Sequence, residues 1–127
     1  MRANRNVDVL KHMIKYCDQI EETVVRFGND YELFLNDNIY KNAVALCVLQ
    51  IGELTTKLTD DFKTAYTGVP WTQIKAMRNI VAHNYGHIDA EILWETIGHD
   101  IPDLKKYCEK IVNQFSVMEQ ECAEDKK

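Results

Sequence analysis

Three side chains near the middle of the chain have types that suit chemistry on a phosphodiester. Arg78, His83 and Tyr85 fall in a segment that begins at Pro70-Trp71. An arginine grips a phosphate with a planar fork of N–H donors, and a histidine exchanges a proton near neutral pH. Together they suffice to cleave a phosphodiester without a metal. The same residues could also be an exposed arginine and a histidine that only caps a helix. The residues alone do not decide between this structural interpretation and the catalytic one.

Helical spacing limits how these groups can meet. Arg78 and His83 are five residues apart, which is about 140° around an ideal helix. They converge only if the helix unwinds near His83 or if a second copy supplies the missing group. Asn79 lies four residues before His83 and shares its face, so it is a supporting candidate. Tyr85 precedes Gly86 in a predicted polar turn, where its hydroxyl is accessible.

No metal or cofactor is expected. His83 and His87 have the spacing His-x-x-x-His with Asp89 nearby, but zinc pairs of that kind need a continuous helix. Gly86 predicts a turn between the two histidines. The four cysteines, at positions 17, 47, 108 and 122, contain no Cys-x-x-Cys pair. The first three fall on apolar helix faces, which indicates reduced core thiols in a cytosolic protein.

The composition fits one soluble domain. The chain has 127 residues, of which 46% are hydrophobic, and no run reaches the ~18 apolar residues of a membrane span. The start of the chain lacks the apolar stretch of a secretory signal, so we predict a cytoplasmic protein without a membrane partner. The net charge of −5 disfavours a general nucleic-acid coat protein. A local positive cleft could still hold RNA.

Apolar residues recur at helical spacing throughout and predict an all-α chain. We expect helices over residues 6–27, 37–58, 70–83 and 89–118, a short turn at 31–35, and a loop or short turn at 59–68. Asp30, Asn36 or Asp37, and Asp89 are the expected caps. Gly98 and Pro102 should kink or break the last helix. The result is an antiparallel bundle of about four helices over residues 1–118, followed by a polar, frayed tail at 119–127.

Two helices carry further expectations. Ile39, Leu46 and Leu49 widen the apolar stripe of the second helix, which should therefore be buried on several sides. Gly52 in that helix suggests close approach of another helix, either within one subunit or at a dimer seam. In the third helix, buried candidates recur beside Arg78, and we expect this helix to form part of a seam between two copies. The candidates are Trp71, Ile74, Met77, Ile80 and Val81.

At this point the chain resembles the HepT-like group of the HEPN superfamily. The motif of that group is Arg, four to six residues, His, any residue, Tyr. Here it runs from Arg78 to His83-Asn84-Tyr85. Ile51-Gly52-Glu53, Pro70-Trp71, Ile88-Asp89 and the later run Asp100 to Leu104 also fit the group, and the resemblance covers about residues 7–115.

The resemblance implies a homodimeric HEPN-like bundle that acts as a metal-independent RNA endonuclease. It implies that Arg78 and His83 are catalytic, and that the protein is the toxin of a type VII toxin–antitoxin pair. The implied antitoxin is an MntA-type nucleotidyltransferase that silences the toxin by transferring AMP to Tyr85. The implied partners are therefore RNA, this antitoxin and a second copy. The alternatives are a non-catalytic helical module that binds a nucleotide or a nucleotidyltransferase, and a purely structural dimeric bundle.

Overall fold

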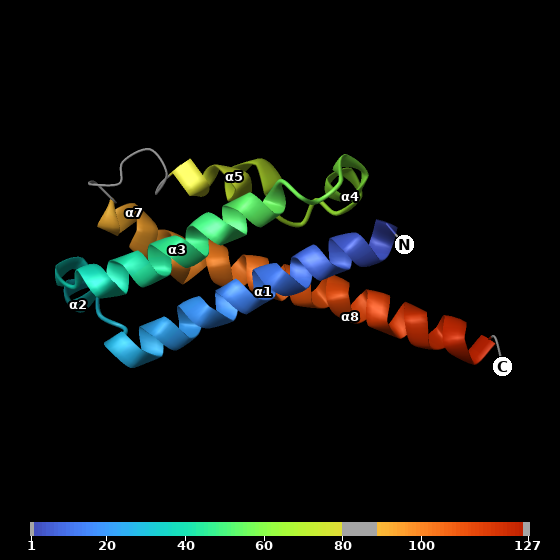
Figure 1. The fold of residues 1–127 in the computed structure, drawn as a ribbon, viewed down its shortest axis with the longest axis horizontal. Coiled ribbons are helices and arrows are strands. Elements are labelled where there is room, and N and C mark those ends of the chain that lie inside the picture. The colour runs from blue at the N-terminus through green and yellow to red at the C-terminus, as the bar shows by residue number, and fades with distance from the viewer. Residues whose placement is uncertain (1, 80–88, 126–127) are drawn as a thin grey trace.

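The computed structural model describes residues 2–79 and 89–125, with the backbone alone for 2–4 and 119–125. Across those ranges the chain is helical and forms no strand, so the predicted all-α class is confirmed. The helices are α1 (Arg2–Phe27), α2 (Tyr31–Asn36), α3 (Asn38–Thr55), α4 (Asp60–Ala65), α5 (Trp71–Ala76), α7 (Ala90–Glu95), the π-helix η1 (Thr96–Asp100) and α8 (Ile101–Asp125). Figure 1 shows α1 running antiparallel to both α3 and α8, with α5 lying along α3.

Aspartates cap three of the helices as predicted. A side-chain oxygen of Asp30 accepts hydrogen bonds from the first backbone N–H groups of α2, and Asp37 does the same for α3. Asp89 accepts from the backbone N–H of Ile92 at the start of α7. Gly28 ends α1 with a φ of +111°, a conformation that glycine adopts without the steric cost of a side chain. Local hydrogen bonding therefore fixes these boundaries.

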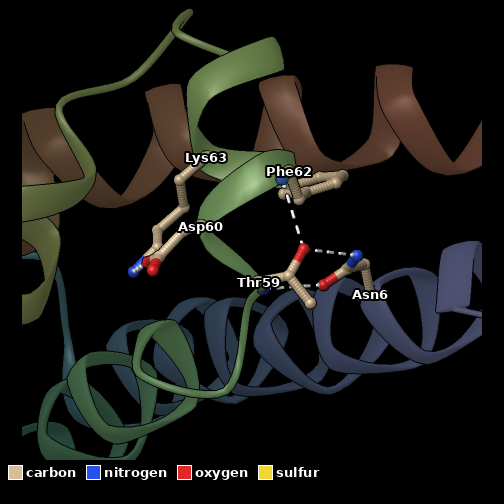
Figure 2. A network of polar contacts seen from close by, with 5 residues as sticks. All are labelled: Asn6, Thr59, Asp60, Phe62 and Lys63. Atoms are coloured by element: carbon tan, nitrogen blue, oxygen red, sulfur yellow. Dashed lines mark hydrogen bonds and ion pairs between the residues drawn. The ribbon is translucent and has the colours of Figure 1, made fainter.

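The segment between α3 and α5, predicted as a loop or short turn, contains a short helix. α3 ends at Thr55, before the predicted end at residue 58, and residues 60–65 form the six-residue helix α4. The Thr59 hydroxyl accepts a hydrogen bond from the Phe62 backbone N–H at 3.2 Å. Asn6 of α1 binds Thr59 twice, donating to its hydroxyl at 3.2 Å and accepting from its backbone N–H at 3.1 Å. Figure 2 shows this network, which ties the start of α4 to α1.

The predicted kink near Gly98 and Pro102 takes the form of a π turn. Residues 96–100 form the π-helix η1, and α8 follows directly from Ile101. Pro102 has no backbone N–H, so the Gly98 carbonyl lacks the donor that a continuous α-helix would give it. α8 then continues beyond Met118 to Asp125. The fraying expected of residues 119–127 stays a prediction.

One hydrophobic core fills the space between the long helices. Cys17, Cys47 and Cys108, from α1, α3 and α8, are buried in it as free cysteines, so their predicted place in the core is confirmed. Burial raises the pKa of the Cys17 and Cys108 thiols to about 12, so both stay protonated near neutral pH. None of the helices in the described ranges combines the length and the apolar character needed to cross a membrane.

The outer face of α3 departs from the prediction of burial on several sides. Ile39 is 71% exposed and Leu46 is 55% exposed, while Leu49 is half-buried. Tyr40, Val44 and neighbouring residues of the opposite face fill the core instead. α3 therefore has one buried face and one partly apolar face turned to solvent.

Candidate functional site

α5 is anchored by its apolar residues, and this anchoring positions Arg78. Trp71, Ile74 and Met77 are each less than 9% exposed and belong to the core. The Trp71 indole N–H donates to the backbone carbonyl of Tyr66 just before the helix. Arg78 follows Met77 directly and is half-buried. The buried side chains of Trp71, Ile74 and Met77 thus fix the position of the backbone from which the Arg78 side chain extends to the surface.

Gly52 of α3 lets the backbone of Arg78 lie against that helix. A Cβ atom on Gly52 would lie 3.0 Å from the Arg78 Cβ and 3.1 Å from its backbone nitrogen. It would also lie 3.2 Å from the carbonyl oxygen of Lys75. The predicted close approach is confirmed, and among the described residues the approaching helix is α5 of the same chain. Gly52 therefore gives no support to a seam between copies.

The same correction applies to the apolar stripe of α5. Ile74 is 3% exposed and Met77 is 6% exposed, because both pack into the core of their own chain. Their burial was predicted correctly. Because both side chains are used inside their own chain, they do not support the predicted seam, and the dimer stays a prediction. Ile80 and Val81 of the same predicted stripe lie outside the described residues.

Glu53, next to Gly52, holds the head of the Arg78 side chain. An Nη1 hydrogen of Arg78 is donated to Glu53 Oε1 at a distance of 3.1 Å. The Arg78 side chain is 37% exposed and that of Glu53 is 49% exposed. This contact uses one donor direction of a guanidinium that has five N–H donors. The remaining donors can reach a phosphate while Glu53 fixes the orientation of the group.

The remaining predicted site residues divide between exposed and undescribed positions. Asn79 follows Arg78 and is exposed. His83 and Tyr85 lie outside the described residues, so their meeting with Arg78 stays a prediction. His12 and His99 are exposed, as expected of surface histidines. Across the ranges that the structure describes, no cluster of three His, Cys, Asp or Glu side chains could hold a metal ion.

Sequence reasoning did not identify Glu53 as the partner of Arg78. The two residues are 25 positions apart, and periodicity reports only which residues share a face of one helix. A signal was nevertheless present. Gly52 already indicated where another helix comes close, and the residue beside such a glycine lies at the edge of that contact. A charged residue there is well placed to pair with a charge on the arriving helix.

Comparison with known proteins agrees with the resemblance seen in the sequence. A family described as "Ribonuclease HepT-like" matches residues 13–111 of the chain. The protein named "Putative RNase MJ0125" from Methanocaldococcus jannaschii is 37% identical over 108 residues, covering 84% of this chain and 90% of its own length. The protein named "Probable ribonuclease HepT" from Thermococcus cleftensis is 36% identical over 104 residues, covering 82% and 93% respectively. No solved structure matches this chain.

Proposed function

The chain belongs to the HepT-like ribonuclease family, and on this premise we propose that it is a metal-independent RNA endonuclease that holds the reacting phosphate on Arg78. The class of enzyme predicted from the sequence agrees with the family and with relatives named as ribonucleases. The observation that supports the choice of Arg78 is its geometry. Its backbone lies against Gly52, and Glu53 holds its guanidinium at the surface. The Glu53 contact leaves the other guanidinium N–H donors available for a phosphate.

The chemistry needs only groups that RNA and these side chains supply. The 2′-OH beside each phosphate is a built-in nucleophile that DNA lacks. Its oxygen attacks phosphorus, loses its proton to a base, and displaces the 5′ oxygen of the next nucleotide, which takes up a proton. Arg78 offsets the negative charge that builds on the phosphoryl oxygens. His83 is the proposed acid or base, with Asn79 as a supporting donor.

We further propose that two copies combine to form the active cleft. One chain supplies one histidine, whereas the displacement needs a base and an acid. Ile39, Leu46 and Glu53 are each seven residues apart, so they form one row along the exposed face of α3. Glu53 at the end of this row holds Arg78. A two-fold contact along the apolar part of the row, with its axis parallel to α3, would cover Ile39 and Leu46 and bring the two Arg78 side chains to the same end of the dimer.

Substitution of the proposed catalytic residues tests the proposed activity. Arg78→Ala and His83→Ala should each reduce single-turnover cleavage of an RNA oligonucleotide by at least about 100-fold. Arg78→Lys should fail as well, because lysine lacks the bidentate fork. Arg26→Ala is the matched control, since Arg26 also forms a surface ion pair, with Glu22 at 2.7 Å. It should cleave at the wild-type rate.

Cleavage should persist in excess chelator, because no step uses a metal. Loss of cleavage in chelator, or a His83→Ala variant that cuts at the original rate, would refute the proposal. A wild-type chain that binds RNA or a nucleotidyltransferase without cutting would favour the alternative, a non-catalytic binding module.

We propose that the enzyme is the toxin of a type VII pair and that an MntA-type antitoxin adenylylates Tyr85. AMP on the tyrosine oxygen would place a phosphate charge two residues beyond His83, where it would compete with RNA for Arg78. Tyr85→Phe should therefore remain toxic while escaping the transferase. Intact-mass measurement after co-expression with the antitoxin should show an added AMP on the parent chain alone. Full silencing of the Phe variant, with no mass gain at Tyr85 in the parent, would refute this switch.

A further inference from the structure

Two grooves of opposite charge flank α5. The first, here called the lysine groove, lies between α4 and α5 and has a volume of about 780 Å³. The second, here called the aspartate groove, lies between α5 and the η1–α8 segment and has a volume of about 340 Å³. Gln73 lines both grooves, so α5 forms the ridge between them. Arg78 lies two residues beyond the end of α5.

The lysine groove has side chains that suit a nucleic-acid backbone. Lys63 and Lys75 line it together with the exposed hydroxyls of Thr64 and Thr67. Asp60 also lines it, but its carboxylate is fully exposed and lies 3.7 Å from Lys63 Nζ. Figure 2 shows these two side chains together on α4. The balance of charge in the groove is therefore positive.

The aspartate groove has the opposite character. Asp100 and Asp103 line it, and both are exposed. Among the described residues that line this groove, none is a lysine or an arginine. RNA phosphates would be repelled on this side of α5 and attracted on the other.

The lysine groove reaches Lys75, close to Arg78 in the chain. Lys75 lies near the end of α5, three residues before Arg78 in the sequence, and both residues lie against Gly52 of α3 through their backbones. Lys75 lines the lysine groove. A strand whose reacting phosphate lies on Arg78 can therefore pass Lys75 next and continue into the groove towards Lys63.

Resting on the proposed ribonuclease function, we propose that the lysine groove binds the single-stranded RNA that flanks the reacting phosphate. Trp71 lines the groove but is only 7% exposed, so it offers no face on which a base could stack. The groove therefore contacts the sugar-phosphate backbone and tolerates any sequence. Together with Arg78 it concentrates positive charge locally on a chain whose net charge is −5.

Binding of an RNA that cannot be cut tests the groove apart from catalysis. A fluorescent 2′-O-methyl oligonucleotide lacks the attacking hydroxyl, and its affinity can be followed by anisotropy over a range of KCl concentrations. Lys63→Gln and Lys75→Gln should each weaken binding about 3- to 10-fold at low salt. Each should also reduce the slope of log K against log salt by about 0.7, the value for one single-strand phosphate contact.

Three matched variants separate this role from a structural one. Lys110→Gln changes an exposed lysine of α8 and should bind as the wild type does. Asp103→Asn, in the aspartate groove, should change the affinity less than Asp60→Asn does, because the RNA does not enter that groove. Asp60→Asn frees Lys63 from its partner and should tighten binding, which damage to the fold would not do. In cleavage assays, Lys63→Gln should raise KM and leave kcat near the wild-type value.

The outcomes distinguish the groove from the chemistry. A chain that binds the oligonucleotide with these charge effects but cuts no RNA would leave the groove supported and refute the proposed function. A chain that cuts RNA, with Lys63→Gln indistinguishable from Lys110→Gln in affinity and salt slope, would refute the groove alone. A wild-type chain that does not bind the oligonucleotide at low salt would also overturn the groove.

Discussion

Under the proposed mechanism, Glu53 must hold the Arg78 side chain and still leave it able to bind the reacting phosphate. A single 3.1 Å contact between partly exposed groups meets both needs, because it orients the guanidinium and leaves most of its donors unused. If Glu53 only stabilised the fold, its loss would lower stability and leave the rate per folded molecule unchanged. If it positions Arg78, its loss should lower the rate constant for cleavage itself.

Glu53→Gln should therefore lower kcat for RNA cleavage by about 3- to 10-fold with KM little changed, since an exposed charged contact contributes on the order of 1 kcal/mol. Glu22→Gln is the control, because it removes the charge of a comparable exposed pair, with Arg26. Relaxation of the Arg78 Nε resonance gives a readout without substrate, and the variant side chain should be more mobile. Equal kcat in both variants, with unchanged Arg78 mobility, would contradict the positioning role.

Gly52→Ala should disturb the same arginine through the backbone. The new methyl would lie 3.0–3.2 Å from atoms of Arg78 and Lys75, so α5 would have to move. We expect a loss of about 1–3 kcal/mol in the free energy of unfolding, although alanine has the better helix propensity by about 1 kcal/mol. Gly98→Ala meets nothing within 4 Å and should be neutral or stabilising. Urea denaturation of both variants measures the change in the free energy of unfolding, which should be a loss for Gly52→Ala and zero or a gain for Gly98→Ala.

At the scale of elements, α4 depends on a contact that comes from the start of the chain. Asn6→Ala removes both hydrogen bonds to Thr59 and leaves the Thr59 backbone N–H without that acceptor. The expected cost is about 1–3 kcal/mol. Asn36→Ala is the control, because Asn36 donates to the Glu32 carbonyl on an exposed surface. Hydrogen exchange should show loss of protection in α4 for Asn6→Ala alone, and equal protection in both variants would contradict this dependence.

Local signals predicted the elements better than they predicted what the elements contact. Aspartate caps and helical periodicity located α2, α3 and α7 at their starts, because capping is decided by neighbouring backbone groups. The same periodicity could not say that Leu46 faces solvent while Ile74 enters the core, since both satisfy a helical repeat. Glu53 was missed for the same reason. Its partner belongs to another helix, and only the tertiary fold brings the two together.

The whole molecule presents a partly apolar face of α3 that the core of one chain does not use. We expect a homodimer of about twice the 14.8 kDa chain mass by light scattering at concentrations on the order of micromolar. Leu46→Asp should shift it to a monomer, because a charge would be buried in the seam. Val25→Asp is the control, since Val25 of α1 is an apolar residue that is 83% exposed. A wild-type monomer would contradict the shared cleft.

The pH dependence of stability follows from the buried thiols. Burial raises the pKa of Cys17 and Cys108 from 9.0 to about 12 in the folded chain. Above pH 9 the unfolded chain loses these thiol protons while the folded chain keeps them, so the free energy of unfolding should fall as pH rises from 9 towards 12. Cys17→Ala and Cys108→Ala together should flatten this decline. If the free energy of unfolding of the double variant falls equally steeply with pH, titratable groups other than these two thiols cause the decline.

The placement of these thiols also gives a way to time the opening of the bundle. The long helices α1, α3 and α8 each carry one buried cysteine, and a thiol reagent attacks only a thiolate that it can reach. In a Cys122→Ser background, the labelling rate of each remaining cysteine therefore measures how often its helix moves away from the core and exposes the thiol to solvent. One shared rate would mean that the three helices separate from the core in a single event. Three different rates would show which helix separates most often and which least often.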